Sequence, residues 1–183
     1  MIYSLTLQQV AIALGLIYIL AHGWALWKPE QTRRFLLAAP RNYPLGVLLM
    51  LAAGLWFCGL IFYADLMDFK SYQNIFLLFA VAMTAAVIWY VREFLTARAL
   101  GVLLLLLANV LLDAAFLRNE PSKLVITVLA YVYAVVGMFL VGSPYHLRDF
   151  LGWLYKTEKC ARWAAWGGVA FGVVLLGLGL FVY

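Results

Sequence analysis

The sequence predicts an all-α integral membrane protein that crosses the bilayer about six times. Of its 183 residues, 67% are hydrophobic and 11% are charged, whereas a soluble domain carries roughly 25% charged residues. The apolar residues gather in six runs, each of about 17–23 residues, which is long enough to cross roughly 30 Å of hydrocarbon as a helix. The runs are continuous rather than alternating, and this excludes the strands of a membrane barrel.

The expected helices follow one another in a single polytopic domain that covers residues 1–183. They are placed at residues 6–27, 45–67, 75–91, 99–117, 124–142 and 163–183. The first and third runs end on aromatic pairs and the sixth begins with two tryptophans, which is typical of a membrane–water interface. The second run opens after Pro44, and the fifth closes at Ser143-Pro144. The fourth run carries the polar residues Asn109 and Asp113.

Basic residues are distributed unevenly between the gaps that separate these runs. The first, third and fifth gaps hold ten of the thirteen: Lys28, Arg33, Arg34, Arg41, Arg92, Arg98, Arg148, Lys156, Lys159 and Arg162. The other three are Lys70, Arg118 and Lys123. Short cytoplasmic loops are enriched in Lys and Arg. The sequence therefore predicts a bacterial-type inner membrane protein with both termini on the non-cytoplasmic side. Arg33, Arg34, Arg92 and Arg148 are the expected anchors at the inner interface.

Two of the cytoplasmic gaps carry apolar residues beside their arginines. Residues 28–44 contain Phe35-Leu36-Leu37, and residues 146–162 place Leu147, Phe150, Leu151 and Leu154 at helical spacing. This pattern predicts short interfacial helices that contact membrane lipids with their basic residues near the headgroups. With one such segment between successive spans, the expected architecture is three helical hairpins.

A short motif recurs in the three basic gaps. Arg33-Arg34-Phe35-Leu36, Arg92-Glu93-Phe94-Leu95 and Arg148-Asp149-Phe150-Leu151 begin 59 and then 56 residues apart. A fixed period indicates an internal three-fold repeat, as in many membrane transport folds. Convergent placement of an arginine and an aromatic anchor at each inner interface explains the motif as well. Both interpretations stay open.

The polar residues inside the fourth and fifth spans form one candidate site. Asn109 and Asp113 are four residues apart and share a helix face. Thr127 and Tyr131 of the next span fall at similar depth. A carboxylate inside a bilayer is costly, and it commonly marks an ion or proton pathway. The alternative is a packing role in which these side chains hydrogen-bond between helices.

The two histidines and the small residues of the sixth span form two more sets of candidate residues. His22 and His146 are candidate ligands of haem b, although their expected depths differ by about 10 Å, and a quinone is the other redox cofactor considered. Neither a cofactor nor a metal is the leading expectation. Ala164, Gly168 and Gly172 stand at four-residue spacing, which predicts a close helix-packing face.

The leading functional hypothesis is a non-enzymatic multi-pass membrane protein that serves as a subunit or scaffold of a larger membrane complex. Its expected partners are lipids, other membrane subunits or further copies of itself, and not nucleic acid. A small ion or solute transporter or channel with Asp113 at its site is the first alternative. A haem- or quinone-binding redox anchor is the second. Cys58 and Cys160 are expected to be free thiols, because the topology separates them in depth.

Overall fold

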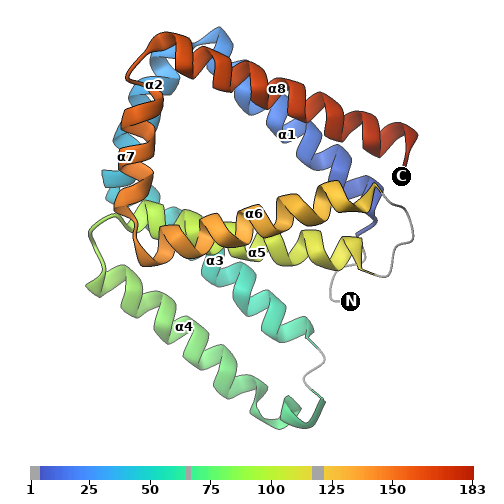
Figure 1. Cartoon of the computed structure of the whole chain (residues 1–183). Coiled ribbons are helices and arrows are strands. Elements are labelled where there is room, and N and C mark those ends of the chain that lie inside the picture. Colours follow the sequence, from blue (N-terminus) through green and yellow to red (C-terminus); the bar gives the residue numbers. More distant parts are fainter. Residues whose placement is uncertain (1–4, 65–66, 117–121) are drawn as a thin grey trace.

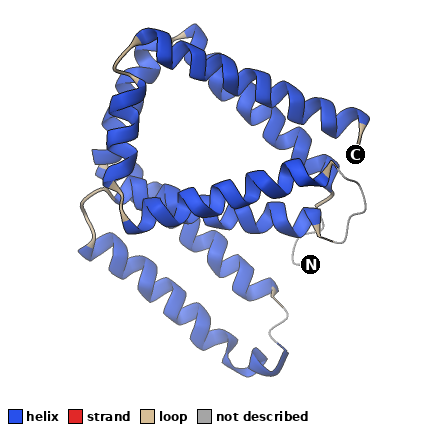
Figure 2. Ribbon diagram, in the orientation of Figure 1, coloured by secondary structure: helices blue, strands red, loops and turns tan. Residues whose placement is uncertain are grey.

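The computed structural model describes residues 5–64, 67–116 and 122–183, and all regular structure in these residues is helical (Figure 2). The long helices are α1 (Leu7–Trp27), α3 (Tyr43–Tyr63), α4 (Gln73–Tyr90), α5 (Leu95–Ala115), α6 (Lys123–Gly142) and α8 (Glu158–Phe181). Within the described ranges, six helical segments are long and apolar enough to cross a membrane. The expected six-helix composition is therefore confirmed.

The boundaries of the long helices agree with the sequence prediction within a few residues. The largest differences are at the starts of α5 and α8, which begin at Leu95 and Glu158 rather than at residues 99 and 163, and at the end of α3, which is Tyr63 rather than residue 67. Arginine and lysine end an apolar run, but they are good helix formers and do not end a helix. The expected residues 65–66 and 117 lie outside the described residues.

Two short helices occupy the two segments that the sequence predicted to be helical. They are α2 (Pro29–Ala38), which the turn η1 (Ala39–Arg41) follows, and α7 (Tyr145–Leu154). Proline is the first residue of α2 and the N-cap of α7, where its missing N–H costs no helical hydrogen bond. The remaining basic gap, between α4 and α5, is different. It is a tight turn in which Phe94 adopts a left-handed conformation with φ 54°.

The helices do not pack as the three expected hairpins. The extensive contacts join α1 to α8, α5 to α6, α3 to α5 and α3 to α4, and α2 lies beside α7. The first and second spans are kept apart by α2, and the fifth and sixth by α7, since a ten-residue helix is about 15 Å long and packed helices need only about 8–10 Å between their axes. The hairpin pairing expected from the sequence is therefore corrected to one in which the first span packs against the last.

These pairs form a triangular frame (Figure 1). The α1/α8 pair and the α5/α6 pair meet at one end and diverge toward the other, where α2 and α7 run between them. We call the end with α2, α7 and the 91–94 turn the basic end. Helices α3 and α4 form an arm on the other side of the α5/α6 pair, and the turn η2 (Met67–Tyr72) precedes α4.

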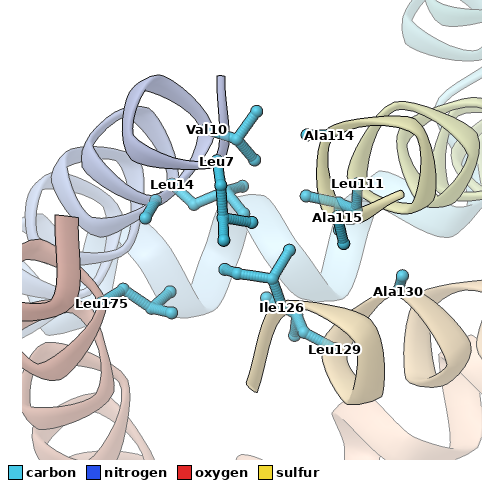
Figure 3. Packing of buried hydrophobic residues seen from close by; sticks show 11 residues of the cluster. Leu7, Val10, Leu14, Leu111, Ala114, Ala115, Ile126, Leu129, Ala130 and Leu175 are labelled. Carbon is cyan, nitrogen blue, oxygen red and sulfur yellow. The ribbon is translucent and has the colours of Figure 1, made fainter. Parts of the chain in front are cut away.

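A buried apolar cluster joins the two diverging pairs at the end opposite the basic end (Figure 3). Four helices contribute to it, and its larger members are Leu7, Val10, Leu14, Leu111, Ile126, Leu129 and Leu175. Leu111, Ile126 and Leu175 are fully buried. Since lipid is as apolar as these side chains, close packing rather than water exclusion stabilises the cluster in a bilayer.

Glycines let the paired helices approach one another. A Cβ at Gly15 would lie 2.9 Å from the carbonyl oxygen of Gly172, and a Cβ at Gly172 would lie 2.9 Å from that of Gly15. Gly101 of α5 and Gly137 of α6 are related in the same way, at 2.8 Å in both directions. Any larger residue at these positions must push the helices apart.

Candidate functional site

The four polar residues of the expected Asp113 site differ in their burial and hydrogen bonding. Asp113 is half-buried near the end of α5, while Asn109 is exposed. The Thr127 hydroxyl donates a hydrogen bond of 3.0 Å to the Lys123 carbonyl of its own helix. Tyr131 is 60% exposed and lies on the outer face of α6. Thr127 and Tyr131 therefore do not supply the converging donors that an ion site around Asp113 would need.

The two histidines lie at opposite ends of α7. His22 borders a recess with Leu154 and Tyr155 at the C-terminal end of α7, whereas His146 is the second residue of that helix. His146 is exposed and contacts the rings of Phe139 and Tyr145. Eight residues of helix separate the two environments by about 12 Å. Two axial ligands must reach one iron, and this geometry does not provide such a pair.

His22 is instead part of an ordered aromatic cluster between α1, α6 and α8. Its Nδ1 donates to the Tyr18 carbonyl at 2.9 Å, and its ring stacks on Tyr18 with centroids 5.4 Å apart. A Cβ at Gly168 would overlap the imidazole ring, so the glycine makes room for it. Gly168 and Gly172 of the expected packing face thus lie against α1, whereas Ala164 borders the recess beside His22.

A hydroxyl–hydroxyl contact links the two diverging helix pairs. Tyr18 of α1 and Tyr133 of α6 are 2.8 Å apart at their hydroxyl oxygens, and Phe171 of α8 packs edge-on against Tyr18. The sequence did not predict this contact between Tyr18 and Tyr133. A tyrosine near the middle of each of two spans was the available signal, since a hydroxyl inside hydrocarbon needs a hydrogen-bond partner.

Replacing Tyr133 by phenylalanine is expected to lower the free energy of unfolding by about 0.6 kcal/mol, the average for a side-chain hydrogen bond in a membrane. Tyr18→Phe removes the same bond, so the double variant is expected to lose no more than either single variant. Denaturant unfolding in detergent micelles measures all three. Losses that simply add would contradict a shared hydrogen bond.

Two recesses at the basic end carry charged side chains. The first, about 430 Å³ in volume, lies at the junction of α1, α2 and α8 and is lined by Glu30, Arg33, Glu158 and Arg162 together with Tyr155 and Trp166. Glu30 and Arg33 form an ion pair of 4.0 Å. Burial raises the pKa of the Tyr155 hydroxyl, so this group remains a hydrogen-bond donor at neutral pH. With two acids and two arginines, the recess has no net charge to attract an ion.

The second charged recess lies around the turn between α4 and α5. Arg92, Glu93 and Arg98 border a volume of about 510 Å³. Arg98 and Val91 also border an apolar groove of about 260 Å³ that continues between α3, α4 and α5. In the sequence, Arg98 is one of the ten basic residues of the first, third and fifth gaps, and no further role is predicted for it. Its position near the start of a span was the available signal.

The remaining expected anchors are Arg33, Arg34 and Arg148, and the expected free thiols are Cys58 and Cys160. Arg148 pairs with Asp149 at 2.7 Å and lies over the Phe94 ring. Arg33 and Arg34 are exposed on α2. Both cysteines are free, with Cys160 exposed and Cys58 half-buried. Within the described ranges, no group of three His, Cys, Asp or Glu residues has a metal-binding arrangement.

The first and third copies of the recurring motif also share their structural surroundings. Each follows a proline by four positions, at Pro29 and Pro144, and each lies in a ten-residue helix. In both copies the phenylalanine is exposed, at Phe35 and Phe150. The second copy lies across the 91–94 turn and has no such helix.

Comparison with protein-family models, curated proteins and solved structures finds no match to this chain.

Proposed function

We propose that this protein is a non-enzymatic multi-pass subunit of a membrane assembly, and that a second copy of the chain docks on α4. The proposed setting is a bacterial-type inner membrane, with the basic end toward the cytoplasm and both termini on the other side. This orientation follows from the ten-to-three distribution of basic residues.

The exposure of α4 is the observation that carries the proposal. Only 6% of the apolar window of this span is buried, compared with 50% for α5. Among the long helices, α4 packs mainly against α3, and the arm that these two form extends away from the other helices (Figure 1). Two copies can therefore meet along α4 without contact between their α1/α8 pairs.

The exposed side chains of α4 are spaced for helix packing. Ile75, Leu78, Ala82 and Ala85 follow a three-four-three spacing, and all four are exposed. We call these residues the α4 stripe. Such spacing keeps one face of a helix against a partner helix, and the two alanines in the C-terminal half of the stripe permit close approach in a membrane. Lipid chains require no such order.

A second copy of the chain is the simplest partner for the α4 stripe. Two copies related by a two-fold axis along the membrane normal present the same surface to each other. The two alanines of each stripe then meet near mid-membrane, where no polar group has to be matched. The exposure of Asn109 and Tyr131 and the bonding of the Thr127 hydroxyl within its own helix also support an assembly role over ion transport.

Cysteine crosslinking tests this interface. In a background with Cys58→Ala and Cys160→Ser, Ala82→Cys is expected to give an oxidised dimer at twice the 20.6 kDa mass of the chain. The matched control is Ala170→Cys, an exposed alanine within α8, which should stay monomeric. Ala82→Leu with Ala85→Leu should convert the dimer to a monomer in mild detergent.

Three results would contradict the proposal. Equal crosslinking at residues 82 and 170 would indicate random collision. No crosslink at residue 82 would exclude α4 as the interface. A crosslinked product of a different mass would show that another protein, rather than a second copy of the chain, docks on α4.

A further inference from the structure

The groove between the α3–α4 arm and α5 is apolar along its length and ends in positive charge. Phe79, Met83 and Val87 of α4 line one wall. Thr84 is also at the groove, but its hydroxyl donates to the Ala80 carbonyl at 2.8 Å and is satisfied. At the basic end the groove opens into the recess that Arg92 and Arg98 border. A long apolar channel with a cationic mouth matches the shape of an amphiphile.

Arg98 is the polar group whose bonding is incomplete. Its Nη1 donates to the Val141 carbonyl at 3.1 Å. Its Nε is buried and, among the described residues, has no hydrogen-bond partner. No carboxylate of the described residues forms an ion pair with it. A guanidinium at the edge of an apolar groove is strongly stabilised by an anion that accepts hydrogen bonds from its remaining N–H donors.

We propose that this groove binds one acidic phospholipid, with the phosphate between Arg92 and Arg98 and an acyl chain along α4. Arg92 lies beside Trp89, with its guanidinium 5.8 Å from the ring, so the headgroup pocket has an aromatic wall. Glu93 also borders the recess, and like Arg92 it is exposed, so water screens both of these charges more than that of the half-buried Arg98. The two arginines leave a net positive charge that selects an anionic over a zwitterionic headgroup.

This inference does not depend on the proposed function. The groove residues of α4 lie on the face toward α3 and α5, whereas the α4 stripe lies on the exposed face. A lipid can occupy the groove whether or not a second copy docks on the stripe. Loss of lipid binding and loss of the dimer are therefore separate outcomes.

Native mass spectrometry of delipidated protein tests the site by titration with dioleoylphosphatidylglycerol. The wild-type chain should retain one lipid more tightly than the dioleoylphosphatidylcholine control. Arg98→Gln should weaken binding about tenfold or more, as expected for loss of a hydrogen bond to a charged group. Lys70→Gln removes the same charge from an exposed residue of η2 that lines neither the groove nor the recess, and it should leave binding unchanged. Met83→Trp should weaken binding by filling the groove.

Circular dichroism and size-exclusion chromatography check that the variants are folded, because Arg98 also holds the end of α6. If Arg98→Gln is misfolded, Met83→Trp decides the result, since it keeps the arginine. Binding unchanged by a folded Arg98→Gln or by Met83→Trp would overturn the proposal. So would equal retention of the two lipids. Displacement of the lipid by inorganic phosphate alone would show a free-anion site instead.

Discussion

Replacing Gly172 by leucine is expected to separate α1 from α8 and to lower the free energy of unfolding by at least about 1–3 kcal/mol, the usual cost of overpacking. A Cβ added at this position would lie 2.9 Å from the Gly15 carbonyl oxygen and from side-chain atoms of Tyr18 and Ile19. Backbone cannot move aside as a flexible side chain can, so the whole helix must shift. Leu14 and Leu175 then lose their packing in the buried cluster.

Gly177→Leu is the matched control for this variant. It makes the same substitution in the same helix, but nothing lies within 4 Å of a Cβ at Gly177. Denaturant unfolding in micelles, followed by tryptophan fluorescence, compares the two. Similar stability losses in both variants would show that helix propensity, rather than the α1/α8 contact, governs the result.

Alanine at Gly101 or Gly137 is expected to destabilise the α5/α6 pair, and the two substitutions are expected not to add. Each new Cβ would lie 2.8 Å from the carbonyl oxygen of the opposite glycine, so either substitution alone forces the helices apart. Each single variant should lose about 1–3 kcal/mol. The double variant should lose less than the sum by about 0.5–3 kcal/mol, because the helices have already separated.

Gly142→Ala provides the control within α6, since nothing lies within 4 Å of a Cβ at that residue. It should leave stability unchanged or raise it slightly, because alanine forms helices better than glycine by about 1 kcal/mol. Simple additivity of Gly101→Ala and Gly137→Ala would mean that the two residues act independently. The reciprocal contact would then not control the spacing of the helices.

The lengths and order of the helices were predictable from the sequence because each follows from a local property. An apolar run of sufficient length specifies a span without reference to any other part of the chain. The partners of the helices were not predictable in this way. The spacing of Gly168 and Gly172 indicated a packing face on α8, but it did not identify Gly15 on α1 as the opposing residue.

The contacts of the candidate site residues were not predictable for a related reason. Asp113 and Thr127 were grouped by depth, which the helical rise gives, but contact also depends on how each helix is rotated about its axis. In spans that are apolar on every side, hydrophobic periodicity does not specify that rotation. The apolar run of the fourth span begins at residue 99 and so predicts Arg98 in a loop, whereas the structure has it in the first turn of α5.

The packing of α1 against α8 has a consequence for how the chain is made. At about 5–20 residues per second of synthesis, a partner that lies about 150 residues later reaches the membrane only after roughly 10–30 s. Helices α5 and α6 are neighbours in the chain and can pair while the ribosome is still translating. Helix α1 must wait, with its Gly15 face toward lipid or an insertion factor, until the last helix arrives. Completion of the triangular frame must therefore follow the synthesis of α8.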